Sequence, residues 1–360
     1  MIGYYVHHQG LGHLQRALSI SRHLAEPPTL LSSLVGPDEG GAAIRSERAS
    51  LPALGRLALP GPDTVHRWVG LPMDNESSPE DHTAHGTLHW VPRHDRGLRR
   101  RMAIIASWID AVEPELMVVD VSVEVAMLCR LMGVPTIVMA MPGDRSDRAH
   151  RTAYDSAHAI LAPWTAEFSA SMWSDRWAGK TFHAGAISRY GEMPPPQCLQ
   201  HDPIRVLVLW GSGGDGRPIE QVEAASRATP GTQWRIAGVG ADARVPVWDL
   251  LCWADVVVTH GGQNAVAEVA AARRPAIVIA QDRPHGEQQA TARTLEAAGL
   301  AVALRSFPDP ARWSELLAAA RVIGGRQWAR WAPPDAAARA AGFLDRTARN
   351  VRHLADEPVA

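Results

Sequence analysis

Short apolar runs alternate with longer amphipathic stretches along the whole chain. The first run, Ile2 to Val6, precedes a helix-compatible stretch from Leu14 to Leu24, and the same alternation restarts at Ile204 to Leu209. Continuous apolar strands that alternate with helices are typical of parallel sheets covered by helices on both faces. The pattern therefore predicts an α/β chain made of two doubly wound halves.

The same periodicities predict the remaining elements. Residues 62–97 show little periodicity and are rich in His, Pro, Asp and Ser, which predicts a long loop near the substrate. Elsewhere we expect helices at 98–112 and 123–132, and strands at 116–119, 136–140, 234–237, 256–259, 276–279 and 301–304.

A run of three prolines, Pro194 to Pro196, separates the two halves. Such a run is stiff and extended, which suits a linker between domains. A chain of 360 residues is long enough for two cores of ordinary size. We therefore expect a first domain at 1–193, a linker at 194–203, a second domain at 204–333 and a C-terminal helical segment at 334–360.

The segment from Trp253 to Gln289 carries the most chemical information. The apolar run Val256 to Val258 ends at T-H-G-G, after which a helix-compatible sequence begins. Free N–H groups and the helix dipole at such a turn attract an anion, and Gly261 and Gly262 let a phosphate approach the backbone. Gln263 and Asn264 add neutral donors, and Glu268, one turn later, can accept hydrogen bonds from sugar hydroxyls.

This segment resembles the donor-sugar signature of GT-B glycosyltransferases, both the UDP-dependent natural-product and plant enzymes and the MurG-type peptidoglycan enzymes. It has their H-G-G-x-N, a Glu eight residues after the His, and an acidic-Gln pair further along. The resemblance implies two Rossmann-like domains that face a cleft, the first for the acceptor and the second for the nucleotide-sugar, with the last helix returning to the first domain. It further places His260, Gly262 and Asn264 at the donor diphosphate, Glu268 at the ribose, and Glu287, Gln288 or Gln289 at the hexose.

A second glycine turn, from Trp210 to Gly216, matches G-x-G-x-x-G. Alone this would suggest a dinucleotide site, but no acidic residue for an adenosine ribose follows the next strand at Ile236 to Gly238. In the GT-B interpretation Ser212 and Gly213 contact the diphosphate from a loop facing Gly261. Residues 244–247 then lie near the nucleobase.

A third turn, H-H-Q-G-L-G-H from His7 to His13, supplies a candidate base. Glycosyl transfer needs an acceptor hydroxyl that loses its proton as it attacks, and an imidazole suits that role near neutral pH. The G-L-G-H pattern resembles the catalytic loop of inverting GT-B enzymes, so we assign His13 as base and place Gly12 among the donor-binding residues. Asp120 ends a strand and resembles the dyad partner in the plant enzymes, where it would fix the tautomer of His13.

Other interpretations of this turn stay open. His13 could hydrogen-bond only within its own helix start, and His7 or His8 could be the base instead. Arg16 could point at the leaving phosphates or form a surface pair.

Composition limits cofactors and partners. A formal charge of −2 gives no global field to recruit nucleic acid, and three widely spaced cysteines suggest neither a disulfide framework nor a zinc site. No run approaches 18 apolar residues. The chain also lacks D-x-D and H-E-x-x-H. We therefore expect a cytoplasmic protein with no metal and no cofactor other than a nucleotide-sugar co-substrate, taken to be a UDP-sugar.

Two further clusters have a functional and a structural interpretation each. The arginines Arg93, Arg96, Arg99, Arg100 and Arg101 form either a docking patch for an anionic lipid at the inner membrane face or, as we favour, a solvated helix face. The tryptophans at Trp164 to Trp177, Trp313, Trp328 and Trp331 either line an apolar acceptor pocket or belong to the core.

Together these features predict an inverting, metal-independent hexosyltransferase that acts on a small-molecule or lipid-linked acceptor. A nucleotide-sugar hydrolase or epimerase on the same fold is one alternative, because G-x-G-H-x-x-R also resembles a turn of a UDP-sugar hydrolase family. A non-catalytic nucleotide-sugar sensor is another.

Overall fold

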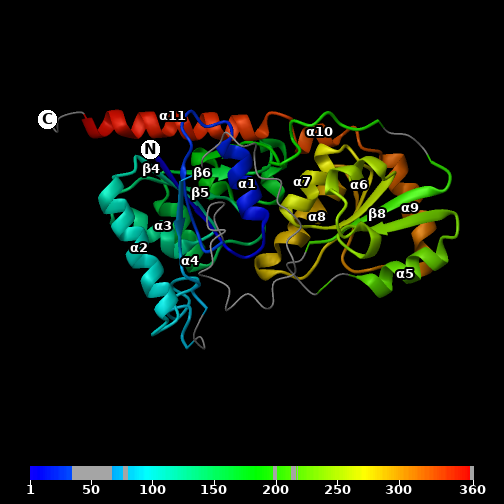
Figure 1. Cartoon of the computed structure of the whole chain (residues 1–360), viewed down its shortest axis with the longest axis horizontal. Coiled ribbons are helices and arrows are strands. Elements are labelled where there is room, and N and C mark those ends of the chain that lie inside the picture. The colour runs from blue at the N-terminus through cyan, green and yellow to red at the C-terminus, as the bar shows by residue number, and fades with distance from the viewer. Residues whose placement is uncertain (35–66, 76–79, 198–200, 212–215, 217, 357–360) are drawn as a thin grey trace. The chain divides into compact units, whose positions relative to one another are not determined.

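The structure is a computed structural model, and it describes all residues except 35–66, 76–79, 198–200, 212–215, 217 and 357–360 (Figure 1). Its contacts divide the chain into two compact units. Unit 1 comprises Met1–Met139, Asp147–Ile160 and Ala341–Ala360, and unit 2 comprises Ala140–Ser146 and Leu161–Ala340. This division differs from the boundary predicted at 194–203, which stays a prediction.

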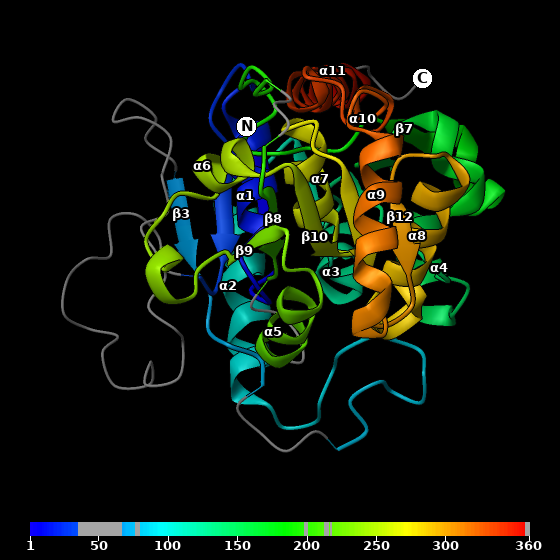
Figure 2. The same cartoon turned by 90° about the vertical axis from the view of Figure 1, so that its right-hand side faces the viewer.

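A parallel sheet forms the centre of unit 1. The strands β1 and β4 are buried along their whole length, as expected for strands covered on both faces. The edge strand β3 is partly exposed, and Figure 2 shows it at the margin of the sheet. The strands of this sheet that lie wholly in unit 1 have the order β3-β2-β1-β4-β5, with β1 at Ile2–Val6, β2 at Thr29–Ser32, β3 at Arg67–Gly70, β4 at Leu116–Asp120 and β5 at Thr136–Met139.

Side-chain caps fix where most helices of unit 1 begin. Asp95, Ser122 and Asp147 each accept a hydrogen bond from a backbone N–H in the first turn of the helix that follows. The helix α1 has no side-chain cap, so its first N–H groups stay available to other partners. The helices are α1 (Gly12–Ser21), α2 (Arg96–Val112), α3 (Val123–Leu131) and α4 (Arg148–Ser156), and the last helix, α11 (Ala336–Asp356), is counted with this unit from Ala341 onward.

Unit 2 holds a second parallel sheet in the order β12-β11-β10-β8-β9. Its core is apolar and includes Val206, Val258 and Ile277, all without exposed surface. The strands are β8 (Ile204–Leu209), β9 (Thr232–Ile236), β10 (Val256–His260), β11 (Ala276–Ile279) and β12 (Val302–Leu304), and the helices are α5 (Ile219–Ala228), α6 (Val247–Trp253), α7 (Gln263–Ala271), α8 (Glu287–Ala297), α9 (Trp313–Ile323) and α10 (Trp328–Trp331).

The pairing of β10 with β8 places two glycine turns at one edge of this sheet. Thr259 lies opposite Leu209, and its hydroxyl donates to the Leu209 carbonyl over 2.8 Å. The carboxyl ends of neighbouring parallel strands are where ligands bind in doubly wound sheets. The turns after Leu209 and after His260 therefore begin side by side.

The elements predicted from periodicity are present, and the differences concern short segments. The strand β3 lies inside the stretch predicted as a loop at 62–97, and α1 begins at Gly12, earlier than expected. Strands of three or four residues are too short to show a period. The unpredicted strands are β2, β3, β6 (Ala159–Ala162) and β7 (Thr181–His183), and the short 3-10 segments are η1 (Ala166–Ser171), η2 (Asp175–Lys180), η3 (Gly240–Asp242), η4 (Pro284–Gly286) and η5 (Pro310–Arg312).

Candidate active site

His13, Arg16 and Asp120 meet in unit 1 where β4 ends and α1 begins. Parallel pairing sets Val6, at the end of β1, opposite Asp120. His13 Nδ1 lies 2.9 Å from Asp120 Oδ1. Asp120 is completely buried, whereas the His13 side chain is 18% exposed. The two residues predicted as a base and its partner are thus within hydrogen-bonding distance, and His13 can still be reached.

The charge state of Asp120 decides which nitrogen of His13 carries the proton. Burial alone would raise the pKa of Asp120, but the charge of Arg16, then that of His13, holds it well below its ordinary value. An ionised carboxylate can only accept hydrogen bonds, so Nδ1 of His13 must donate. The other ring nitrogen, Nε2, then carries the lone pair that a base needs.

Arg16 is buried, so the expected surface pair was wrong, and its contact with the leaving phosphates stays a prediction. Its side chain is 2% exposed. Nε donates to Asp120 Oδ2 over 3.1 Å, and Nη2 donates to Oδ1 over 2.6 Å. The spacing of three residues between His13 and Arg16 puts both on one helix face, which is the sequence signal that could have indicated this cluster.

The neighbouring histidines are weaker candidates for the base. Burial, followed by the nearby His13 and His8, lowers the pKa of His7 to about 3. Burial likewise lowers the pKa of His8, whose Nε2 is 3.7 Å from an Asp74 oxygen. A base is most effective when its pKa lies near the working pH. These shifts argue against His7 and His8 as the base.

The low pKa of His7 predicts acid sensitivity. Its folded-state pKa of about 3 is below the ordinary value of 6.5, so its contribution to stability is complete above pH 6.5 and is lost as the pH falls toward 3. We expect this group alone to reduce the free energy of unfolding by roughly 3 kcal/mol at pH 4. Urea unfolding at pH 7 and pH 4 should show a smaller pH effect in His7→Gln than in the wild type, and equal effects would contradict the prediction.

His260 ends β10 in unit 2 and is neutral at physiological pH. Burial, with a smaller effect from Arg283, lowers its pKa to about 4. Its Nδ1 accepts the Gly262 N–H over 2.9 Å, so the proton of the neutral ring is on Nε2. His260 can therefore donate one neutral hydrogen bond to an anion, but it adds no positive charge.

The N–H groups of the two turn glycines are already bonded within unit 2. Gly262 donates to His260, and Gly261 donates to Gln288 Oε1 over 3.0 Å. The same oxygen of Gln288 also accepts the Gln281 N–H over 3.0 Å. Gln288 is 3% exposed and holds the turn in shape. Sequence alone does not distinguish such a buried amide from one that faces a ligand.

Donors for an anion are instead offered by the first turn of α7. Gly262 is the N-cap residue and provides no side-chain cap. Val266 is the residue whose N–H donates back to the Gly262 carbonyl. The N–H groups of Asn264 and Ala265 come before it, in the first turn, where a helix offers them no backbone acceptor. All three positions from Gly262 to Asn264 are partly exposed. The positive end of the helix dipole adds to this local preference for negative charge.

The second glycine turn approaches the same histidine. A methyl group on Gly211 would lie 2.9 Å from His260 Nε2, and the Trp210 ring packs edge-on against His260 with centroids 5.5 Å apart. The two turns therefore converge on His260 within unit 2. Ser212 and Gly213 lie outside the described residues, so their contact with the diphosphate stays a prediction.

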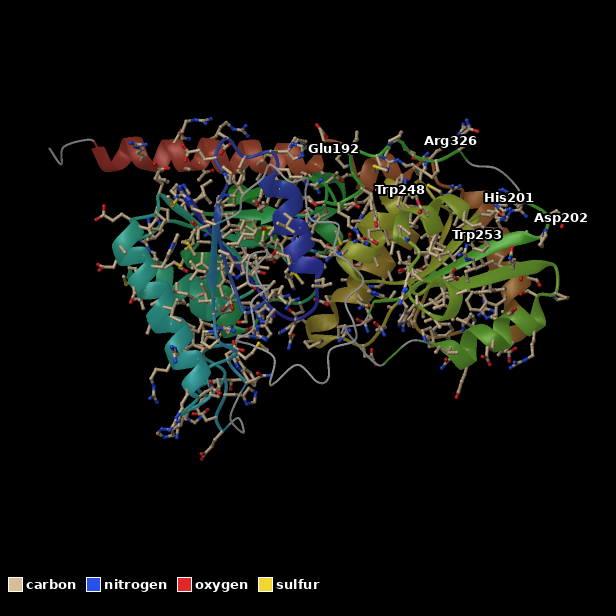
Figure 3. All side chains as sticks on the ribbon, in the orientation of Figure 1. Glu192, His201, Asp202, Trp248, Trp253 and Arg326 are labelled. Atoms are coloured by element: carbon tan, nitrogen blue, oxygen red, sulfur yellow. The ribbon has the colours of Figure 1, made fainter. Side chains whose placement is uncertain are left out.

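Glu268, predicted to bind the ribose, pairs with an arginine. It is 7% exposed, and its Oε1 lies 2.8 Å from Arg189 Nε. Burial raises the pKa of Glu268, and Arg189 opposes that shift. The Arg189 guanidinium also lies 4.6 Å from the centre of the Tyr190 ring. The Tyr190 ring contacts Trp248, which is labelled in Figure 3, with ring centres 5.0 Å apart. Arg189 and Tyr190 were not singled out from the sequence, because an isolated arginine shows no pattern.

The residues predicted at the hexose have separate partners. Glu287 Oε2 lies 3.2 Å from Arg145 Nη2, and Gln289 Nε2 donates to Asp282 Oδ1 over 2.7 Å. Glu287 and Gln289 are partly exposed, in contrast to Gln288. The outward-facing members of this set are therefore Glu287 and Gln289.

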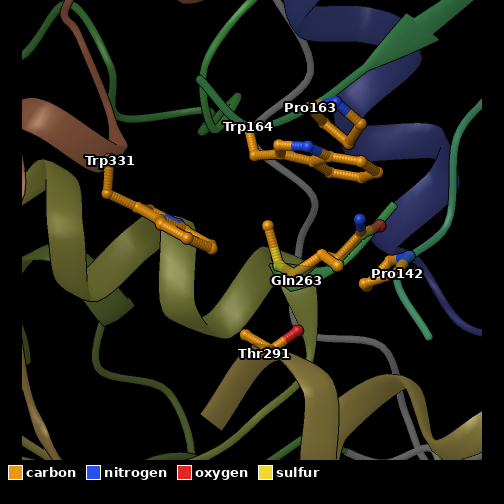
Figure 4. A pocket seen from close by; sticks show the side chains of 7 residues that line it. Pro142, Pro163, Trp164, Gln263, Thr291 and Trp331 are labelled. Atoms are coloured by element: carbon orange, nitrogen blue, oxygen red, sulfur yellow. The ribbon is translucent and has the colours of Figure 1, made fainter. Parts of the chain in front are cut away.

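Two tryptophans line a small pocket of unit 2. Figure 4 shows the rings of Trp164 and Trp331 and the amide of Gln263 directed toward the same space. Gln263 is the first residue of α7, so the pocket adjoins the turn after β10. Trp313 and Trp328 are 1% exposed and belong to the core. The remaining lining residues are Pro142, Pro163, Met172 and Thr291.

The arginine cluster does not form one surface. Arg101 is 1% exposed and donates to Asp74 over 2.6 Å, to the Tyr5 hydroxyl and to the Pro72 carbonyl. Both interpretations placed it on an exposed face, and both were wrong for this residue. Arg93, Arg96, Arg99 and Arg100 are exposed. Within the residues that the structure describes, no helix is long and apolar enough to cross a membrane.

Comparisons with known proteins agree with the resemblance seen at the donor turn. Residues 247–307 match the glycosyltransferase family 28 C-terminal domain. The UDP-N-acetylglucosamine--N-acetylmuramyl-(pentapeptide) pyrophosphoryl-undecaprenol N-acetylglucosamine transferase of Salmonella paratyphi B is 33% identical over 194 residues, 44% of this chain and 52% of that protein. The enzyme of the same name from Cronobacter sakazakii is 33% identical over 134 residues, 30% of this chain and 38% of that protein. The chain thus spans about half, or less, of the length of these relatives.

Solved structures resemble the chain over nearly its whole length. MurG of Acinetobacter baumannii has a TM-score of 0.60 at 12% identity, covering 96% of this chain and 99% of MurG. The calicheamicin glycosyltransferase has a TM-score of 0.60 at 18% identity, covering 97% of this chain and 98% of that one. The predicted fold class, two Rossmann-like domains of the GT-B type, is confirmed. The chain thus has the GT-B fold, and the similarity to a named family lies in residues 247–307.

Proposed function

We propose that this chain is an inverting glycosyltransferase that moves a hexosyl group from a UDP-sugar to an acceptor hydroxyl without a metal ion. The observation that carries the proposal is the contact between His13 and the ionised Asp120, which leaves Nε2 of a reachable imidazole unprotonated. The acceptor proton passes to Nε2 while its oxygen attacks the anomeric carbon. The bond from that carbon to the diphosphate breaks in the same step, which inverts the configuration.

The donor is assigned to unit 2. The diphosphate is placed at the N-terminus of α7, where Asn264 and the Nε2–H of His260 supply neutral donors. Glu268 is assigned to the ribose hydroxyls, through the oxygen that does not contact Arg189, and Glu287 and Gln289 to the hexose.

The relatives support a UDP-sugar donor and suggest one kind of acceptor. The name of the Salmonella paratyphi B enzyme specifies UDP-N-acetylglucosamine and an acceptor on pyrophosphoryl-undecaprenol. For this chain we propose a UDP-sugar, with a lipid-linked or a small-molecule acceptor. We place the reaction in the cytoplasm, which suits the free thiols of Cys129 and Cys252.

One assay separates this proposal from its alternatives. The protein is incubated with a panel of nucleotide-sugars, and release of the nucleoside diphosphate is followed with and without acceptor extracts. Release that depends on acceptor supports a transferase. Release at full rate without any acceptor identifies a hydrolase, and binding without turnover identifies a sensor.

Chelation is expected to leave the rate unchanged. The helix N-terminus and the His260 donor are assigned to stabilise the departing diphosphate, so the step needs no divalent ion. Turnover is measured after dialysis against EDTA and again after Mg²⁺ or Mn²⁺ is added. Loss with EDTA and recovery with metal would refute metal independence while leaving the fold assignment intact.

A further inference from the structure

Arg16 holds the carboxylate partner of the candidate base. It donates to both oxygens of Asp120 and is itself buried. Its Nη2 is also 3.2 Å from His13 Nδ1. Both of these nitrogens carry protons when Asp120 is ionised, so they cannot hydrogen-bond to each other. They lie close together because both donate to Oδ1 of Asp120.

We propose that Arg16 is a positioning residue for the base, clamping Asp120 so that only the Nδ1–H tautomer of His13 is held. The inference rests on the proposed function, since it assigns Arg16 a role in the same proton transfer. A two-pronged pair between a guanidinium and a carboxylate fixes the rotation of the carboxylate as well as its charge. Oδ1 is thereby kept facing His13.

The charge of Arg16 matters as much as its geometry. Without it, burial would favour the neutral acid form of Asp120. A neutral carboxylic acid can donate its proton in a hydrogen bond to His13 Nδ1. The imidazole would then carry its own proton on Nε2, which is the atom that must accept the proton of the acceptor. Loss of Arg16 would thus leave His13 unable to accept the proton of the acceptor hydroxyl.

NMR of the ring nitrogens, in protein whose histidine imidazoles are isotope-labelled, identifies the tautomer of His13. The His13 signals are the ones that disappear in His13→Gln. We expect the neutral His13 of the wild type to carry its proton on Nδ1. In Arg16→Gln the Nε2–H form should gain population, as in Asp120→Asn, while Arg16→Lys should largely keep the wild-type form. The wild-type tautomer in a folded Arg16→Gln protein would overturn the proposal.

A matched variant separates positioning from folding. Arg101→Gln also removes a buried, carboxylate-paired arginine from unit 1, but one that does not touch Asp120. Its His13 tautomer should stay that of the wild type even if unit 1 is destabilised. A tautomer change of equal size in Arg101→Gln would assign the effect to general loss of structure and overturn the proposal.

Kinetics give a second readout. Arg16→Gln should lower kcat about 10²-fold with little change in the KM for the donor, and Arg16→Lys should recover much of the loss. A rise in donor KM with unchanged kcat would contradict a role at the base. If the wild type releases no nucleoside diphosphate with any donor, the proposed function fails, whereas the NMR comparison still decides what Arg16 does to His13.

Discussion

Replacement of His13 by alanine is expected to lower kcat by about 10²–10⁴-fold, because the acceptor hydroxyl loses the group that takes up its proton. The affinity for the donor should stay close to that of the wild type, since the diphosphate is assigned to α7 and His260 in unit 2. Turnover is measured as nucleoside diphosphate release, and donor binding by calorimetry. A lower kcat with unchanged donor affinity indicates loss of a base, whereas weaker donor binding indicates loss of a binding residue.

His158 provides the control for this experiment. It is an exposed histidine of unit 1 in the turn between α4 and β6, and its backbone N–H bonds to Thr136. His158→Ala should keep wild-type turnover. If His13→Ala turned over as fast as His158→Ala, His13 would have no part in the reaction.

Replacement of Gly262 by alanine is expected to weaken UDP-sugar binding by roughly 10–100-fold, corresponding to about 1.4–2.8 kcal/mol. An added methyl group would lie 2.4 Å from Cε1 and 2.6 Å from Nδ1 of His260, closer than atoms can pack. The ring would have to move, and the donor on its Nε2 would move with it. Calorimetric titration with UDP tests this directly.

Gly231→Ala is the matched substitution. Gly231 is also in unit 2, and a methyl group there would meet no atom within 4 Å. We expect it to bind UDP as the wild type does. Normal binding by Gly262→Ala would remove the turn after β10 from the donor site.

The sequence predicted β1, β8 and β10, because each is an apolar run that is followed by a glycine turn. Val256 to Val258 and the helix after them were recognisable from their period and from H-G-G-x-N, and Asp120 from its place at a strand end. The roles assigned to these residues stay predictions. What the sequence does predict well is which turns lie at the carboxyl ends of parallel strands.

The sequence did not predict the partners of the buried arginines. Arg16 and Arg101 look like surface residues in a chain rich in arginine, and only the fold reveals that each meets a carboxylate. Arg189 meets Glu268 across 79 positions of sequence. The same holds for Gln288, whose side chain bonds to backbone groups of the turn instead of facing outward. Such pairs depend on long-range contacts that leave no local period.

The end of helix α11 completes the packing of unit 1, although most of that unit comes from the first half of the chain. The core of unit 1 includes Leu344 of α11, which has no exposed surface, and Asp345 accepts the Ala25 N–H over 3.1 Å. Arg352 pairs with Glu115 over 3.1 Å. During synthesis, the strands of unit 1 emerge from the ribosome long before the helix that completes their packing. Although domains near the N-terminus generally fold first, unit 1 should become protease-resistant only after residues 341–356 have been translated.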